Sequence, residues 1–342
     1  MELMLMPSAG FLAASIILFL IGFLGFFGNL IVIIIMCRDK NLWTPVNFIL
    51  FNVIVSDFSV AALGNPFTLA SAIAKRWFFG QSMCVAYGFF MALLGITSIN
   101  SLTVLALERY LIVSQPVSHG SLSRPTALTI VGSIWLYSFV ITAPPLVGWG
   151  EYGLEAANIS CSINWETRSH SSTSYILFLF TFGFFIPIIV ISYSYMNIIL
   201  TMKKSTMNAG RVNKAESRVT WMIFVMIFAF FLAWTPYAIL ALMIAFFDSN
   251  VSPAIATIPA IFAKTSICYN PFIYAGLNTQ FRQSWRRVLG GKREDSTTMA
   301  TATSFGLNSK RYKEVSCVID VKGKDKIKLS ALNKSTATET AI

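Results

Sequence analysis

The chain has 342 residues, of which 55% are hydrophobic and only 12% are charged. A soluble domain carries about twice that charged fraction, so the composition excludes an ordinary soluble protein and indicates that lipid surrounds most of the chain. The net charge of +11 does not indicate nucleic-acid binding, because basic loops and a basic tail beside an anionic membrane leaflet account for it.

Seven apolar stretches are long enough to cross a bilayer, which takes about 20 helical residues. They lie near residues 13–37, 47–73, 84–113, 125–147, 174–202, 218–247 and 254–275. The predicted fold class is all-α, a seven-transmembrane helix bundle over 13–275 that follows a short extracellular N-terminus over 1–12. Prolines inside several spans supply kinks: Pro66, Pro144, Pro145, Pro187, Pro236 and Pro271.

The distribution of basic residues predicts the orientation, because loops rich in Lys and Arg stay on the cytoplasmic side. Of the 26 Lys and Arg residues, only Lys75, Arg76 and Arg168 fall in loops on the side of the N-terminus. We therefore expect a multi-pass protein of the cell membrane with an extracellular N-terminus and a cytoplasmic C-terminus.

Two of the five cysteines, Cys84 and Cys161, face the oxidising exterior in this topology. A disulfide between them is the economical interpretation. It would tie the top of the third span to the loop over about residues 148–173, and hold that loop as a lid over the bundle.

The chain changes character after the seventh span. Phe281, Trp285, Val288 and Leu289 recur at helical spacing, which predicts an amphipathic membrane-surface helix over 276–289. From residue 290 to 342 the composition favours a disordered cytoplasmic tail. A dense hydroxyl cluster in that tail is a candidate kinase substrate, with a merely soluble tail as the alternative: Ser296, Thr297, Thr298, Thr301, Thr303 and Ser304.

One charge lies in the middle of the membrane. Lys264 is ten residues from both Ala254 and Tyr274, which places it roughly 15 Å from each end of the seventh span. A lysine there raises the free energy of insertion by about 2.5–3.5 kcal/mol, and its stem of about 6 Å cannot reach the interface. A desolvated amine forms a Schiff base with an aldehyde; alternatively it binds an anionic ligand or pairs with an acid.

A protonated imine on Lys264 needs a carboxylate partner. Asp57 is the only acid deep in another span, but it lies about one helical turn or more nearer the cytoplasm. Glu155 lies in the lid loop, six residues before Cys161, so the disulfide would hold it close above the pocket. We predict that Glu155 is the counterion; the alternative is a solvated loop acid such as Glu151.

Together these residues resemble the rhodopsin-like G-protein-coupled receptors over roughly residues 20–289. The order, side and depth of the short motifs carry the resemblance, because each motif alone is weak evidence. The motif residues are Asn29 in the first span, Asp57 in the second, Glu108-Arg109-Tyr110 at the inner end of the third, Trp234-Thr-Pro-Tyr237 in the sixth and Asn270-Pro271-Phe-Ile-Tyr274 in the seventh.

Lys264 narrows the resemblance to the opsins, because it stands six residues before Asn270, the spacing of the retinal-attachment lysine in that family. The run from Lys264 to Phe281 and the run Gly148-Trp-Gly-Glu-Tyr152 are similar to ciliary-type opsins. Within those opsins, the chain is most similar to the encephalopsin, teleost multiple tissue opsin and arthropod pteropsin group.

Tyr87, three residues after Cys84, departs from the vertebrate visual pigments, which carry a glutamate counterion at that place. The departure favours Glu155 as the counterion. The resemblance implies retinal as the cofactor, bound to Lys264 as a protonated Schiff base, 11-cis in the dark and all-trans after light. The residues expected to line its pocket are Trp234, Tyr237, Phe184, Met91 and Tyr87.

The resemblance implies a light-sensing receptor, and neither an enzyme nor a metal site is expected. Isomerisation inside a close-packed cavity would move Trp234 and let the sixth helix swing at Pro236. The resting lock would pair Arg109 with Glu108 and Glu216, the alternative being an ordinary interfacial ion pair. The expected activation switch comprises Glu108, Arg109, Tyr110, Glu216, Asp57, Asn29, Asn270, Pro271 and Tyr274.

The expected partners are a heterotrimeric G protein, with the inhibitory class suggested by similar opsins, arrestin and a receptor kinase at the tail, and membrane lipid. Three other functions are open. One is a photoisomerase that takes all-trans retinal and supplies the 11-cis form, and another is a receptor whose lysine binds a diffusible anionic ligand. The third, a transporter, is disfavoured because no inverted repeat of broken helices is evident.

Overall fold

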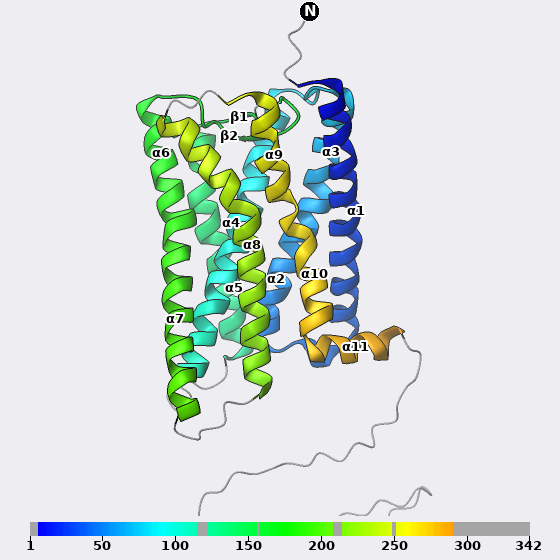
Figure 1. Cartoon of the computed structure of the whole chain (residues 1–342), viewed down its shortest axis with the longest axis vertical. Coiled ribbons are helices and arrows are strands. Elements are labelled where there is room, and N and C mark those ends of the chain that lie inside the picture. Colours follow the sequence, from blue (N-terminus) through cyan, green and yellow to red (C-terminus); the bar gives the residue numbers. More distant parts are fainter. Residues whose placement is uncertain (1–5, 115–121, 156, 208–213, 248–250, 290–342) are drawn as a thin grey trace, which may run out of the picture. The chain divides into compact units, whose positions relative to one another are not determined.

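The computed structural model describes residues 6–114, 122–155, 157–207, 214–247 and 251–289. Within these residues, long helices run side by side as a bundle (Figure 1). The predicted all-α, seven-span fold class is confirmed. The predicted tail and its hydroxyl cluster lie outside the described residues.

The spans differ in how continuous their helices are. The helices in chain order are α1 (Ser8–Arg38), α2 (Pro45–Ser59), α3 (Asn65–Ala74), α4 (Gln81–Ser114), α5 (Arg124–Thr142), α6 (His170–Phe180), α7 (Ile186–Met207), α8 (Lys214–Phe247), α9 (Pro253–Lys264), α10 (Ser266–Leu277) and α11 (Thr279–Leu289). Short π-helical segments join α2 to α3 (η2, Val60–Gly64) and α6 to α7 (η4, Thr181–Phe185), so each pair forms one span. In the described part of the chain, six spans are long and apolar enough to cross a membrane as single helical segments.

The fourth span ends earlier than the sequence predicts. α5 stops at Thr142, and the 3-10 turn η3 (Pro144–Val147) follows it. Proline has no backbone N–H and cannot continue the hydrogen-bond ladder of a helix. Pro144 and Pro145 therefore lie beyond the helix and do not kink it, which corrects the expectation from the sequence.

The seventh span is divided at Thr265, between α9 and α10, which are 12 residues each. The N–H of Thr265 donates to the carbonyl of Phe262 at 3.0 Å, and the N–H of Cys268 donates to the carbonyl of Thr265 at 2.9 Å. These bonds span three residues where an α-helix spans four, and such a tightened turn inside a helix often marks a hinge. Lys264 is therefore the last residue of α9 and does not lie within a continuous helix.

The lid, defined here as residues 148–169, closes one end of the bundle (Figure 1), which we call the lid end. It contains an antiparallel hairpin of β1 (Tyr152–Leu154) and β2 (Cys161–Ile163). The predicted disulfide joins Cys161 to Cys84 at the start of α4, with a Cα–Cα distance of 5.4 Å. Because Leu154 pairs with Cys161 in the hairpin, the disulfide also holds the residue that follows Leu154.

α11 runs across the opposite end of the bundle (Figure 1). Its apolar face is anchored by Phe281, which is 2% exposed and packs against Tyr274 with ring centroids 6.1 Å apart. Its polar face reaches the segment after α1, where Arg287 Nη2 lies 3.4 Å from Asp39 Oδ2. This is the amphipathic helix that the sequence predicts.

The outward faces of the helices are apolar. Phe19, Phe23 and Phe27 of α1 contact one another in sequence along the helix and are 57%, 52% and 47% exposed. A water-soluble protein rarely shows such a continuous apolar face, whereas a helix in lipid requires it. The bundle is that of a multi-pass membrane protein.

Candidate functional site

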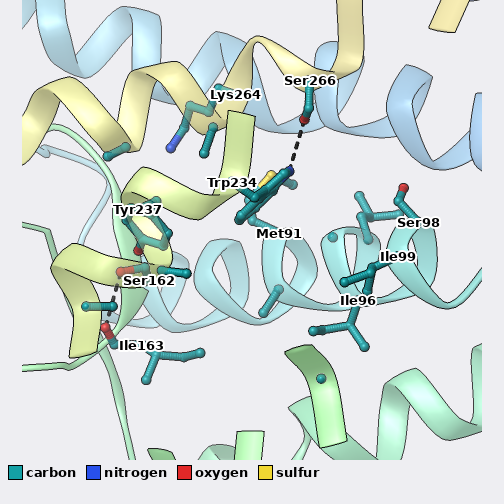
Figure 2. A pocket seen from close by; sticks show the side chains of 18 of the residues that line it. Met91, Ile96, Ser98, Ile99, Ser162, Ile163, Trp234, Tyr237, Lys264 and Ser266 are labelled. Atoms are coloured by element: carbon teal, nitrogen blue, oxygen red, sulfur yellow. Dashed lines mark hydrogen bonds between the residues drawn. The ribbon is translucent and has the colours of Figure 1, made fainter. Parts of the chain in front are cut away.

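A cavity of about 190 Å³ lies beneath the lid. Lys264 and Glu155 both line it, and most of its other walls are apolar. Figure 2 shows side chains from α8, α9 and α10 converging on this space. All five side chains that the sequence analysis expects around a retinal also line the cavity: Trp234, Tyr237, Phe184, Met91 and Tyr87.

Lys264 and Glu155 meet at the lid side of the cavity. The Lys264 Nζ lies 3.9 Å from the Glu155 Oε2, and the two side chains are 20% and 13% exposed. This distance is longer than a direct hydrogen bond, so charge attraction holds the pair together. The other carboxylate among the described lining residues is Asp57, which is engaged elsewhere.

Local backbone bonds position Glu155. Its N–H donates to the carbonyl of Ser160 at 2.9 Å, and its own carbonyl accepts from the N–H of Asn158 at 2.7 Å. The side chain is directed by Tyr237, whose hydroxyl donates to Glu155 Oε1 at 2.8 Å. Glu155 is therefore a built part of the cavity wall and not a solvated loop acid.

Trp234 links α8, the sixth span, to α10 in the seventh span. Its indole N–H donates to Ser266 Oγ at 3.1 Å, as the dashed line in Figure 2 shows. A Cβ added to Gly95 would lie 3.5 Å from the Trp234 ring, so the ring packs directly on the backbone of α4. Because Ser266 lies just beyond the break at Thr265, a movement of Trp234 would act on both α8 and α10.

Tyr87 does not pair with the lysine as a charge would. Its hydroxyl shares a hydrogen bond of 2.6 Å with Thr68 Oγ1 of α3, and Ser160 Oγ donates to it at 3.5 Å. The residue that stands in the place of a visual-pigment counterion therefore joins α4, α3 and the lid through hydrogen bonds.

A polar cluster lies at the deep end of the cavity. Asp57 Oδ2 accepts a hydrogen bond of 2.7 Å from Asn270 Nδ2, and Asp57 Oδ1 accepts one of 3.5 Å from Ser98. Asn29, expected beside Asp57, donates instead to the backbone carbonyl of Ile267 at 2.9 Å. These contacts join the first, second, third and seventh spans.

Arg109 forms a bidentate ion pair near the opposite end of the bundle. Its Nε lies 2.6 Å from Glu108 Oε2 and its Nη2 lies 2.7 Å from Glu108 Oε1. The side chains are 3% and 10% exposed. Tyr110 packs against Tyr193 of α7, with ring centroids 5.5 Å apart. Glu216 is in the first turn of α8, but its side chain lies outside the described residues, so its pairing with Arg109 stays a prediction.

Several cavity residues were not expected from the sequence, and Trp165 is the most informative of them. Its indole N–H donates to the Tyr237 hydroxyl at 3.1 Å. Its place four residues after Cys161 could have put it over the cavity, since the disulfide anchors that segment. Ser266 and Thr68 carry no sequence signal of this kind, because a serine or threonine in a span is more often a local helix contact.

Comparison with known proteins shows which family this chain belongs to. A sequence model of the family described as 7 transmembrane receptor (rhodopsin family) matches residues 28–274. The chain is 37% identical over 284 residues to parapinopsin of Ictalurus punctatus, covering 81% of this chain and 82% of that protein. It is 37% identical over 265 residues to pinopsin of Gallus gallus, covering 76% of each. The crystal structure of squid rhodopsin aligns with a TM-score of 0.78 and 31% identity, covering 83% of this chain and 87% of that one.

Proposed function

The chain belongs to the rhodopsin family of seven-transmembrane receptors and, as a relative of opsins, is a light-sensing G-protein-coupled receptor; from that premise we propose that Lys264 is the attachment point for retinal. The observation that carries the proposal is a buried amine beside a single carboxylate at one end of an apolar cavity. Retinal, bound as a protonated Schiff base, supplies absorption of light and a change of shape from 11-cis to all-trans.

The residues present fit such a group. An apolar polyene needs apolar walls, and Trp234, Phe184 and Met91 supply them. Its one charged end needs a partner, which Glu155 supplies. Two unit charges about 4 Å apart attract by about 4 kcal/mol at an effective dielectric constant of about 20. That is enough to offset the insertion penalty of about 2.5–3.5 kcal/mol for a lysine at this depth.

Trp234 and Pro236 connect the cavity to the helices that would move. Pro236 lies inside α8, where the missing backbone bond permits a kink. A push on Trp234 reaches α8 directly and α10 through Ser266. We propose that Glu216 of α8 is a resting partner of Arg109 beside Glu108, and an outward swing of α8 would then separate Arg109 from Glu216.

We place the lid end outside the cell and the Arg109 end in the cytoplasm, because loops on the lid side carry few basic residues. This leaves Arg109 facing a heterotrimeric G protein, proposed to be of the inhibitory class. Arrestin and a receptor kinase would engage the tail. The runs that begin at Gly148 and Lys264 support assignment to the ciliary-type opsins and their encephalopsin, multiple tissue opsin and pteropsin group.

The decisive experiment is to add 11-cis retinal in the dark to the purified protein and to record spectra before and after acid denaturation. We expect a visible band and, after denaturation, a retinal that remains covalently bound. Lys264→Ala should abolish both. Lys75→Ala is the matched control, because Lys75 is an exposed lysine at the lid end whose amine donates to Ser8, and its pigment should be normal.

The same preparation tests the alternatives. An absorbance no different from that of the free chromophore would overturn the proposal and leave a receptor of other chemistry. Light that releases 11-cis retinal from an all-trans complex would favour the photoisomerase. Light-dependent lowering of cyclic AMP in cells would support the inhibitory G-protein class, and a dark pigment without any such response would contradict it.

A further inference from the structure

We propose that Trp165 is a positioning residue that orients the hydroxyl of Tyr237 to donate its hydrogen bond to Glu155 and so stabilises that carboxylate beside Lys264. The inference rests on the proposed function, because it concerns the counterion of the same site. It assigns a role to a lid residue that contacts neither the amine nor the carboxylate directly.

Four side chains form a continuous relay. The indole Nε1 of Trp165 donates to Tyr237 Oη at 3.1 Å. Tyr237 Oη donates to Glu155 Oε1 at 2.8 Å, and Glu155 Oε2 lies 3.9 Å from Lys264 Nζ. The relay starts in the lid, crosses α8, returns to the lid and ends at the last residue of α9.

The chemistry of the donors sets the direction of the relay. An indole N–H donates only, and a tyrosine hydroxyl has one proton and can also accept. Because Trp165 fills an acceptor site of the Tyr237 oxygen, the proton of that hydroxyl is left for another partner. Hydrogen bonds to a charged acceptor are roughly twice as strong as neutral ones, so the Tyr237 hydroxyl donates its hydrogen bond to the carboxylate of Glu155.

The neighbouring hydroxyl competes only weakly for the same proton. Ser162 lines the cavity beside Tyr237, but its own proton goes to the carbonyl of Ile163 at 3.2 Å. Ser162 also contacts the Tyr237 hydroxyl, but it carries no charge. Glu155 is the stronger acceptor of the two.

Packing fixes the indole in its donating position. The Trp165 ring lies 6.0 Å from the ring of Phe180 and meets the Tyr237 ring edge-on, at 6.2 Å and 79°. The same four side chains also border a second, smaller cavity of about 50 Å³ between the lid and helices α8 and α9. Without its indole donor, the Tyr237 hydroxyl could turn toward the polar groups of that second space.

Other titratable groups face Glu155 or share its cavities, and any pH test must separate them. Asp57 already accepts from Asn270, at the deep end of the main cavity. The complete set among the described lining residues is Lys264 of α9, Tyr237 of α8, Tyr87 of α4, Asp57 of α2 and Glu166 of the lid. Of these, Tyr237 makes the hydrogen bond to Glu155 that the relay requires.

The test uses the full chain regenerated with 11-cis retinal and follows the visible band as the pH is lowered. Protonation of Glu155 removes the charge partner, so weakening its hydrogen bond should move the acid-side midpoint to higher pH. We expect Trp165→Phe to raise this midpoint by about half to one pH unit and Tyr237→Phe by about one to two, since each change weakens a hydrogen bond to a charged group. In the Tyr237→Phe background, Trp165→Phe should add nothing.

A matched control and a conservative variant complete the design. Trp149 is also a lid tryptophan whose N–H donates to a hydroxyl, Ser174 Oγ at 2.9 Å, and Trp149→Phe should leave the midpoint unchanged. Trp165→Tyr, which keeps a ring and a donor, should bring the midpoint part of the way back toward the wild-type value. If Trp165→Phe alone lowers the yield of folded protein, this second variant still reports on the hydrogen bond.

Three outcomes would overturn the inference. The first is an unmoved midpoint in Trp165→Phe. The second is a shift caused by Trp165→Phe that is equally large in the wild-type and in the Tyr237→Phe background. The third is faster dark bleaching by hydroxylamine with an unmoved midpoint, which would make Trp165 only a plug between the two cavities. A wild-type chain that forms no covalent pigment would instead refute the proposed function, so the two failures are distinguishable.

Discussion

Glu155 illustrates how a single side chain is made suitable for charge pairing. The disulfide holds the strand before it, two backbone bonds fix its turn, and Tyr237 occupies one carboxylate oxygen. The other oxygen is left to face Lys264.

At this scale we predict that Glu155→Gln moves the visible band strongly toward the ultraviolet at neutral pH. An amide cannot balance the imine charge, so the proton affinity of the imine falls and the neutral form, which absorbs at shorter wavelength, is populated. The measurement is an absorption spectrum of the regenerated variant. Glu151→Gln is the control, because Glu151 is an exposed lid acid bound to Asn164 and Thr167. A band that does not move in Glu155→Gln would refute the counterion role.

Among the elements, the lid and the divided seventh helix position the site together. The hairpin would not hold its place over the bundle by its own short ladder, because two strands of three residues make few bonds. The Cys84–Cys161 bond ties it to α4 across a sequence separation of 77 residues. On the other side, the break at Thr265 ends α9 at Lys264.

We predict that the double change Cys84→Ser and Cys161→Ser lowers the melting temperature of the purified protein. A native disulfide contributes about 2–4 kcal/mol to folding stability in typical cases, which corresponds to a shift of several degrees. The yield of pigment should also fall, since Glu155 follows β1, which pairs with the strand that the disulfide anchors. Cys37→Ser is the control because Cys37 is an exposed free thiol. Equal melting temperatures in the two variants would contradict the anchoring role.

The docking of α11 should depend on pH through Asp39. Burial raises the pKa of Asp39, but the nearby Ser284 hydroxyl, the hydrogen bond from Asn41 and the charge of Arg287 outweigh it and hold the pKa below its usual value. A carboxyl with a lowered folded pKa stabilises the fold above its unfolded pKa of about 4 and loses that contribution as the pH falls through the folded value. Since Arg287 is about half exposed, the ion pair itself contributes only about 0.2–1 kcal/mol.

We therefore predict that Asp39→Asn lowers the hydrogen-exchange protection of the α11 amides at pH 7. The difference from the wild-type protein should persist at pH 4 and vanish only below the lowered folded pKa of Asp39, where the wild-type carboxyl is protonated as well. Arg282→Gln removes a charge from an exposed position of the same helix and serves as the control. Protection that differs between Asp39→Asn and wild type equally at all pH values would show that charge is not the cause.

For the whole molecule, the two ends of the bundle are connected through its polar interior. The cavity reaches from Glu155 beneath the lid to Asp57, and Asp57 is bonded to Asn270 of α10. Farther from the lid, Tyr274 packs against α11 through Phe281. A disturbance at Lys264 thus has a contiguous route through the seventh span to the end that carries Arg109.

We predict that Glu108→Gln raises activation of the G protein in the dark severalfold while light activation persists. The change removes the charge that a buried Arg109 now pairs with through two short bonds, and breaking a buried pair destabilises the resting arrangement by about 3–5 kcal/mol. The measurement is nucleotide exchange on the G protein with and without light. Glu151→Gln, far away in the lid, should leave dark activity at its basal level. Dark activity at the basal level in Glu108→Gln would argue for an ordinary structural ion pair.

Much of the fold follows from local sequence properties. The seven spans were predictable because apolar length is a property of consecutive residues, and the amphipathic α11 because its period is visible over 11 residues. The end of α5 before Pro144 was missed, since hydropathy continues through the prolines although the hydrogen-bond ladder does not. The hairpin in the lid was also missed, because strands of three residues carry no periodic signal.

The sequence by itself determined the class of protein and singled out Lys264, because the free energy of placing a lysine among apolar residues depends on the span around it. Only the tertiary structure decided the surroundings of that lysine: that it ends α9, that Tyr237 donates to Glu155 and Trp165 to Tyr237, and that Asn29 reaches the backbone of Ile267. Glu155 and Tyr237 are separated by 82 residues and Trp165 and Tyr237 by 72. Directional bonds over such separations exist only once the helices have packed, because packing sets the distances on which they depend.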